Sequence, residues 1–140
     1  MHSLHHLWMK TYLRMKRLVS AQAAPLGLSP GQPKILEFLA QHGEHEQKDI
    51  ADYCEIEPAT VGSILLRMET AGLVTRRNRP DNRRSLYVSL TPTGRKMAQT
   101  VQDIFAAAEA QITAGLTEEE RATLYEPLSK CLQNGKGTVK

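Results

Sequence analysis

The chain has 140 residues, of which 41% are apolar, and this size and composition predict a single folded domain. Its two cysteines, Cys54 and Cys131, lie far apart without metal-binding spacing, which excludes a disulfide framework and fits a reducing compartment. The N-terminus is too polar for a signal peptide, and no apolar run approaches the length of a membrane span. We therefore expect a soluble cytoplasmic protein without a membrane partner.

Positive charge is concentrated in one part of the chain. The formal net charge is +3, but the segment 67–96 holds eight arginines and lysines against two acidic residues, so the remaining residues sum to −3. Most charged segments are merely solvated surface. A positive field confined to one segment instead favours contact with nucleic acid.

The first predicted elements are two helices. Large apolar residues recur at helical spacing over 4–22, after which Pro25 and Gly27 interrupt the pattern. Ser29 is predicted as the N-cap of the next helix, with a proline at its first helical position, and Gly43 is predicted to end that helix.

A helix-turn-helix pattern and a hairpin follow. A short helix is predicted over 47–54 and a second one over 58–71, separated by a three-residue turn. Gly72 is expected to close the second helix as a left-handed C-cap. Two strands are predicted, at 73–77 and 85–90, because the apolar residues of the second alternate with polar ones around a basic turn.

The C-terminal part is predicted to be helical again. A long helix is expected over 92–114, and a capping-box pattern starting at Thr117 opens a last helix over 117–132. Pro127 is expected to kink or break that last helix. The glycine- and lysine-rich residues 134–140 are expected to fray.

This order of elements defines a winged helix-turn-helix, so the predicted fold class is mainly α with a small β-hairpin wing. The second helix of such a motif lies in the major groove of DNA. Its outward stripe, opposite the apolar one, is predicted to consist of Ala59, Thr60, Ser63, Arg67 and Thr70. The plainer interpretation of this stripe is a solvent-exposed helix face, and the basic hairpin beside it favours DNA contact.

The hairpin supplies the second set of predicted DNA contacts. Arginines on a short β-loop suit phosphate and minor-groove contact, and those predicted to act this way are Arg77, Arg79, Arg83 and Arg84. Asp81 stands among them, where a carboxylate would repel phosphate unless it had a structural task. It could hydrogen-bond the turn backbone or pair with Arg83, and these two roles are not exclusive.

Several of these stretches together resemble the MarR family of bacterial transcriptional regulators. They are Leu28-Ser29-Pro30-Gly31-Gln32, Ala59-Thr60-Val61, the run from Glu69 to Val74, Asp81-Asn82-Arg83-Arg84, and Leu90-Thr91-Pro92-Thr93-Gly94. The resemblance spans about residues 4–132. It implies a lobe over 29–91 that binds double-stranded DNA, with helices over 4–22 and 92–133 forming a homodimer.

The same resemblance has functional implications. It implies a pseudo-palindromic operator, usually for repression, and an arginine, Arg83 or Arg84, that enters the minor groove while Asp81 braces the wing. It also implies a cleft for a small aromatic effector. Trp8 and Tyr12 either line that cleft or belong to the dimer core, which is the plainer interpretation.

Other functions find little support in the sequence. There are no paired carboxylates in a pocket pattern, no phosphate-binding glycine loop and no nucleophile motif, so we expect neither an enzyme nor a cofactor. The histidines near the N-terminus and in the loop after Gly43 lack partners for a metal site, and none is predicted. Cys54 is interpreted as a buried structural thiol rather than a redox sensor. The alternative function is a winged-helix protein-interaction module that does not bind DNA.

Overall fold

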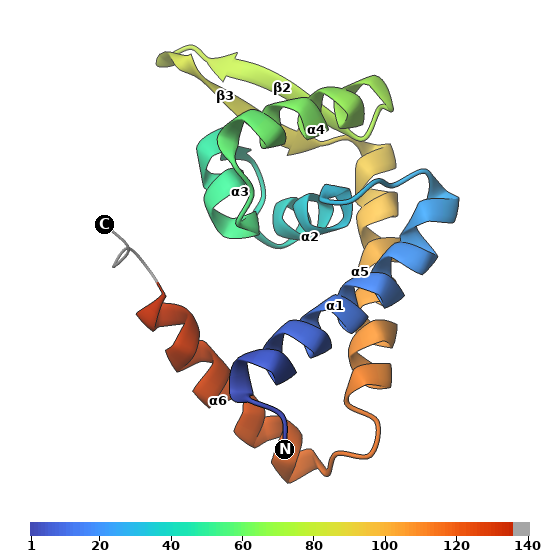
Figure 1. Cartoon of the computed structure of the whole chain (residues 1–140). Helices are drawn as coiled ribbons and strands as arrows, with labels where there is room; N and C mark the ends of the chain where they lie inside the picture. The colour runs from blue at the N-terminus through green and yellow to red at the C-terminus, as the bar shows by residue number, and fades with distance from the viewer. Residues whose placement is uncertain (136–140) are drawn as a thin grey trace.

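The computed structural model describes residues 1–135, in which a winged lobe sits above a pair of crossing helices (Figure 1). The helices are α1 (Leu4–Ala23), α2 (Gln32–His42), α3 (Gln47–Cys54), α4 (Pro58–Thr70), α5 (Pro92–Ile112) and α6 (Glu118–Asn134), with a short 3-10 turn, η1 (Ala24–Leu26), after α1. The strands are β1 (His45–Glu46), β2 (Val74–Arg79) and β3 (Asn82–Leu90). They form one antiparallel sheet in the order β1-β3-β2. The predicted fold class, mainly α with a hairpin wing, is confirmed.

The core of the lobe is built from the apolar faces of α2, α3 and α4, the sheet and one face of α5. The largest fully buried side chains are Ile35, Leu36, Ile50, Val61, Leu65, Met68, Val74, Val88 and Val101. Helix α4 buries the stripe that its helical periodicity predicts, since Ile64 is buried as well. This packing leaves the opposite face of α4 on the surface.

The junction between α4, β2 and α5 explains two of the sequence motifs. Gly72 is left-handed with φ +76°, and the backbone N–H of Leu73 donates to the carbonyl of Met68 over 2.9 Å, so α4 closes as predicted. The Thr91 hydroxyl donates to the Gly72 carbonyl over 2.6 Å and accepts from the backbone N–H of Gly94. A Cβ at Gly94 would overlap the Leu73 carbonyl oxygen, so only glycine lets α5 start this close to the wing.

Two predicted details of the helices are wrong. Ser29 is not the N-cap of α2, because Gly31, with φ +92°, precedes the first helical residue, and Pro33 rather than Pro30 lies in the first turn. Helix α6 continues through Pro127, so a break there is wrong, whereas the alternative, a kink, stays a prediction. The capping box that opens α6, between Thr117 and Glu120, is confirmed. The predicted fraying of 134–140 falls almost entirely outside the described residues.

The wing is longer than predicted, because both strands continue to a two-residue turn at Pro80 and Asp81. The short strand β1, which was not predicted, pairs with the base of β3, with His45 opposite Val88. This third strand attaches the base of the wing to the loop after α2. The far end of the wing projects beyond the lobe (Figure 1).

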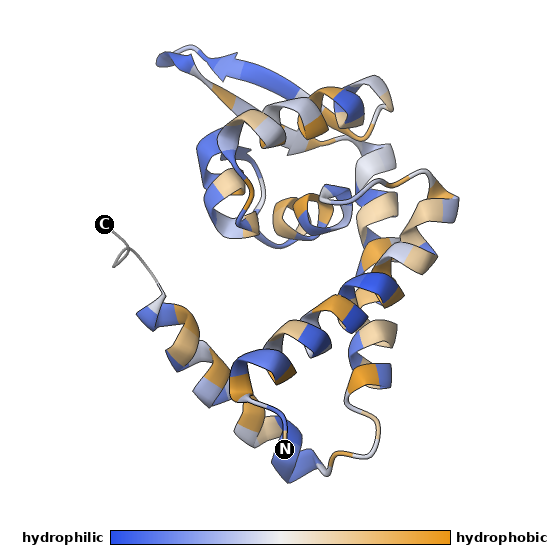
Figure 2. Cartoon of the chain, viewed as in Figure 1, coloured by the Kyte–Doolittle hydropathy of each residue, from blue (hydrophilic) through white to orange (hydrophobic). Residues whose placement is uncertain are grey.

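Helices α1 and α6 leave large apolar side chains uncovered. Helix α1 crosses α5 below the lobe, and α6 runs away from the rest of the chain and has no buried residue (Figures 1 and 2). The exposed apolar residues of these two helices are Leu4, Leu7, Trp8, Met9, Tyr12, Leu124, Tyr125, Leu128 and Leu132. None of the helices within residues 1–135 combines the length and apolarity that a membrane span requires.

Candidate nucleic-acid interface

The outward face of α4 carries small and polar side chains. All five residues of the predicted stripe are exposed, as expected: Ala59, Thr60, Ser63, Arg67 and Thr70. Two of the hydroxyls bond back to the helix, because Ser63 Oγ donates to the Ala59 carbonyl over 3.4 Å and Thr70 Oγ1 donates to the Leu66 carbonyl over 3.0 Å. The face is therefore flat and open enough for close approach to a duplex groove.

Leu66 lies on this face and was missed in the sequence interpretation. Its side chain is 55% exposed, although leucine is an apolar residue. The spacing of Ser63, Leu66 and Thr70, three and four residues apart, is the signal that places all three on one helix face. Leu66 therefore gives the face an apolar contact point.

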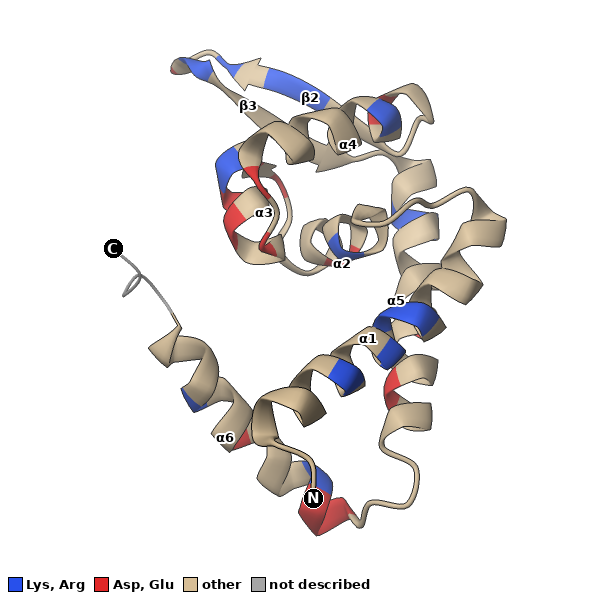
Figure 3. Cartoon of the chain, in the orientation of Figure 1, with Lys and Arg blue, Asp and Glu red and all other residues tan. Residues whose placement is uncertain are grey.

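The tip of the wing presents two arginines whose side chains have no hydrogen-bond or ion-pair partner within residues 1–135. Arg83 and Arg84 are both exposed, and they lie where the pairing of β3 with β2 is irregular, between the Asn82–Arg79 and Leu86–Asn78 pairs. Asn78 supports this end of the hairpin by donating from Nδ2 to the carbonyls of Arg83 and Ser85, over 2.8 and 2.9 Å. In Figure 3 the basic residues follow β2 to the tip of the hairpin.

Neither contact expected of Asp81 is present in residues 1–135. Its side chain is exposed, and its carboxylate accepts no hydrogen bond there and makes no ion pair with Arg83. Asn82 has the expected turn role instead, since its side-chain oxygen accepts from the backbone N–H of Arg84 over 3.2 Å. The Asp81 charge acts only at longer range: the hydrogen bond to Glu44 is the main cause that raises the pKa of Arg79, and Asp81 adds a smaller contribution.

Arg77 and Arg79 are held on the outer face of the sheet by Glu44, which precedes β1. The Glu44 carboxylate accepts from Arg79 Nη2 over 2.8 Å and from Arg77 Nη2 over 3.3 Å. It also accepts from Ser89 Oγ over 2.5 Å. The Arg79 guanidinium stacks 4.1 Å from the centre of the Tyr87 ring. Both arginines thus have partners within the chain.

These donors make Glu44 a persistent anion. The Ser89 hydroxyl and then the Arg79 guanidinium lower the pKa of Glu44 to about 2. The carboxylate is therefore ionised throughout the neutral range, and its ion pairs with both arginines persist there.

Arg76 belongs to the base of the wing rather than to its tip. Its Nη1 donates to Gln47 Oε1 over 2.9 Å, and its Nη2 lies 3.3 Å from Glu69 Oε1. These contacts connect β2 to α3 and α4. Arg76 therefore has structural contacts at the base of the wing, and only 15% of its side chain is exposed.

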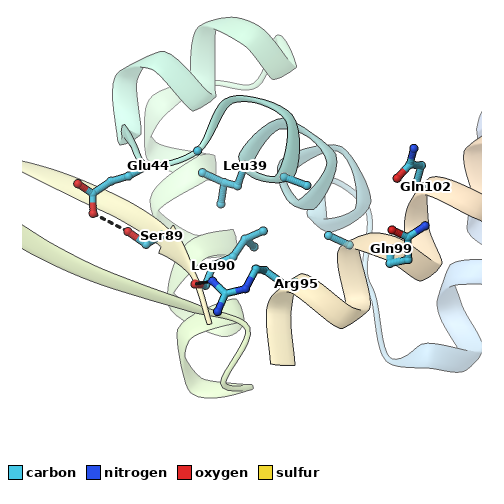
Figure 4. A pocket seen from close by; sticks show the side chains of 10 residues that line it. Leu39, Glu44, Ser89, Leu90, Arg95, Gln99 and Gln102 are labelled. Atoms are coloured by element: carbon cyan, nitrogen blue, oxygen red, sulfur yellow. Dashed lines mark hydrogen bonds between the residues drawn. The ribbon is translucent and has the colours of Figure 1, made fainter. Parts of the chain in front are cut away.

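An open cavity of about 500 Å³ lies between the end of α2, the base of β3 and α5 (Figure 4). Apolar residues such as Leu39 and Leu90 form one part of its wall, and Arg95, Gln99 and Gln102 supply polar groups. Glu44 and Ser89 also line it. Trp8 and Tyr12 do not line it; they lie on α1 with exposed fractions of 47% and 62%.

The structure gives little support to redox sensing or metal binding. Burial raises the pKa of Cys54 to about 11, so its thiol stays protonated at neutral pH and is a poor redox sensor. His42 and His45 pack against Phe38. Within residues 1–135, no three His, Cys, Asp or Glu side chains are grouped in a way that could hold a metal ion.

An exposed recognition helix beside a basic wing, on a helix-turn-helix lobe, defines the class of winged-helix DNA-binding proteins. Comparisons with known proteins agree with this class. The model of the MarR family matches residues 28–86. The HTH-type transcriptional repressor Rv2887 of Mycobacterium tuberculosis is 30% identical over 112 residues, which cover 80% of this chain and 81% of that protein.

Solved structures show the same fold. The transcriptional regulator PA4135 superposes with a TM-score of 0.84 at 25% identity, covering 98% of this chain and 100% of the other. Bordetella bronchiseptica BpsR, whose DNA binding is regulated by 6-hydroxynicotinic acid, superposes with a TM-score of 0.83 at 24% identity and 94% coverage of both chains. The chain belongs to the MarR family and is a DNA-binding transcriptional regulator.

Proposed function

We propose that the chain acts in the cytoplasm as a homodimeric repressor that binds a pseudo-palindromic operator and is released by a small-molecule effector. The observation that carries this proposal is that the outward face of α4 and the arginine tip of the wing are both exposed on one lobe. Figure 3 shows α4 beside β2, with basic residues along the hairpin. A duplex that receives a helix in its major groove offers its neighbouring minor groove and phosphates to such a wing.

Helix α4 is proposed to read the major groove. Ala59, Thr60 and Ser63 are small enough to let the helix approach base edges closely. Arg67 is long enough to form two parallel hydrogen bonds to a guanine, and Leu66 can pack against the methyl group of a thymine. The wing supplies position and minor-groove contact through Arg83 and Arg84, with Arg77, Arg79 and Asp81 setting the charge around them.

A second copy of the chain is proposed to cover α1 and α6. Both helices expose rows of large apolar side chains, and a helix such as α6 without any buried residue is marginal on its own. A two-fold dimer buries the same patch of both subunits. Trp8 and Tyr12 fall on this surface, so we propose dimer contact as their first role and contact with an effector as the alternative.

The proposed effector site is the cavity beside α5. Its volume of about 500 Å³ falls within the range of small-molecule pockets, and its wall combines apolar side chains with Arg95, Gln99 and Gln102. This mixture suits a small planar compound with hydrogen-bonding or acidic groups. The regulation of BpsR by 6-hydroxynicotinic acid supports this class of ligand.

Arg67→Ala tests the proposed function. We expect this change to weaken binding to the preferred operator by about tenfold or more, because one bidentate base contact accounts for about 1–3 kcal/mol, and to weaken binding to random DNA much less. Arg67→Lys is the matched control, since it keeps the charge but not the planar pair of donors. It should bind random DNA like the wild type and still discriminate poorly.

Fluorescence anisotropy with both duplexes at two salt concentrations measures these differences. Equal losses on operator and random DNA would reduce Arg67 to a phosphate anchor. A wild-type protein with no salt-dependent affinity for any duplex would instead favour the alternative function, a winged-helix protein-interaction module.

A further inference from the structure

Glu44 occupies an unusual position for an acidic residue in a DNA-binding lobe. It follows Gly43, the residue that ends α2 with φ +76°, and precedes β1 at the edge of the sheet. From there its carboxylate reaches Ser89 on β3 and then Arg77 and Arg79 on β2. One side chain therefore connects the loop after α2 to both long strands of the wing.

The wing needs such a connection. A two-stranded hairpin is marginally stable on its own, and β1, the only other strand that pairs with it within residues 1–135, has two residues at its base. Arg77 and Arg79 lie on one face of β2, where their like charges repel each other. The Glu44 carboxylate compensates both charges, and the Tyr87 ring beneath Arg79 fixes the guanidinium from below.

We propose that Glu44 is a positioning residue for DNA binding: it holds Arg77 and Arg79 on the outer face of the wing and thereby sets the direction in which the wing presents Arg83 and Arg84. This inference rests on the proposed function. It also separates the arginines of the hairpin into two kinds. Arg77 and Arg79 orient the wing, whereas Arg83 and Arg84 contact DNA.

The proposal predicts that removal of the negative charge of Glu44 weakens DNA binding. If Glu44 acted only through its charge, its removal would relieve repulsion of phosphate and strengthen DNA binding. If it positions the wing, its removal weakens DNA binding even though the protein becomes more positive. The two possibilities therefore predict opposite directions for the same variant.

Glu44→Gln tests this, with Glu46→Gln as the matched control. Glu46 lies two residues away on β1 and accepts from the Tyr87 hydroxyl over 2.9 Å, a bond that glutamine can keep, and it makes no ion pair with a wing arginine. Both variants remove one negative charge from nearly the same place. We expect Glu44→Gln to weaken operator binding by about threefold to tenfold, as for the loss of a well-formed ion-pair network, and Glu46→Gln to leave it unchanged or slightly stronger.

A double-mutant cycle shows whether Glu44 acts through the two arginines. In an Arg77→Ala, Arg79→Ala background, Glu44→Gln should have no further effect on affinity. Additive losses, or tighter binding by Glu44→Gln in the wild-type background, would overturn the proposal. An unchanged thermal midpoint in Glu44→Gln separates a change of wing position from a general loss of stability.

Amide hydrogen exchange on the free protein tests, without any DNA, whether Glu44 holds the wing in place. Glu44→Gln should speed amide exchange in residues 77–84 relative to Glu46→Gln, because β2 loses its ion pairs to the loop after α2 while the pairing of β1 with the base of β3 remains. Equal exchange in the two variants would refute the positioning role even if the protein bound no DNA. A wild type that binds no duplex, with faster wing exchange in Glu44→Gln, would contradict the proposed function alone.

Discussion

Replacing Arg83 and Arg84 together with alanine will weaken operator binding by about 30-fold near physiological salt and lower the slope of log Kd against log salt by about two units. Each lost phosphate contact removes about one released counterion, which accounts for both numbers. The two side chains are exposed, and the hydrogen bonds that form the turn come from Asn78 and Asn82. The fold should therefore survive the change.

Lys130→Ala is the control for the loss of positive charge, because Lys130 is exposed and belongs to α6. Figure 3 shows α6 far from the wing. It should change neither the affinity nor the salt slope. Anisotropy titrations at four or more salt concentrations give both quantities for each variant. An unchanged slope in the double arginine variant would show that the wing does not touch DNA, and the proposed interface would be wrong.

Breaking the apolar face of α6 should have a larger effect still. Leu124→Glu combined with Leu128→Glu places two charges on a surface that we propose to be buried between subunits, at positions that are each about half exposed in the isolated chain. We expect light scattering to give a monomer mass near 15.6 kDa at micromolar concentration. Operator affinity should fall by about 100-fold or more, because two linked lobes gain that much over one.

Ala122→Glu provides the comparison within the same helix. Ala122 is exposed on the side of α6 that carries Glu126 and Lys130, away from the leucine stripe. A charge there should leave both the dimer and the affinity intact. A dimer that persists in the double leucine variant would show that α6 is not an essential part of the interface.

Local physical rules account for most of the features that could be predicted from the sequence. The apolar period of 3.6 residues located the buried stripe of α4, and thus its outward face. The chemistry of Gly72 and of the Thr117 capping box located helix ends, because each depends on residues only a few positions apart. The basic hairpin could be recognised because its arginines lie within a few residues of one another in the sequence.

The features that were missed depend on contacts across long sequence separations. Glu44 contacts Arg79 because β1 pairs with β3, and the residues around Glu44 in the sequence do not indicate this partner, which lies 35 positions away. Arg76 is next to Arg77 in the sequence, but its guanidinium bonds Gln47 and Glu69, residues that the chain brings close only on folding. Helix α6 includes Pro127 although an interior proline removes a backbone donor and crowds the preceding turn, so the local rule that predicts a break does not hold here.

Binding selection from random duplexes tests the central claim most directly. The wild-type protein should enrich an inverted repeat with half-sites about one helical turn apart, because a two-fold dimer presents two α4 helices to successive major grooves on one face of the duplex. Enrichment of no sequence, or of a single unrepeated site, would contradict the account of this chain as a dimeric, sequence-specific DNA-binding regulator.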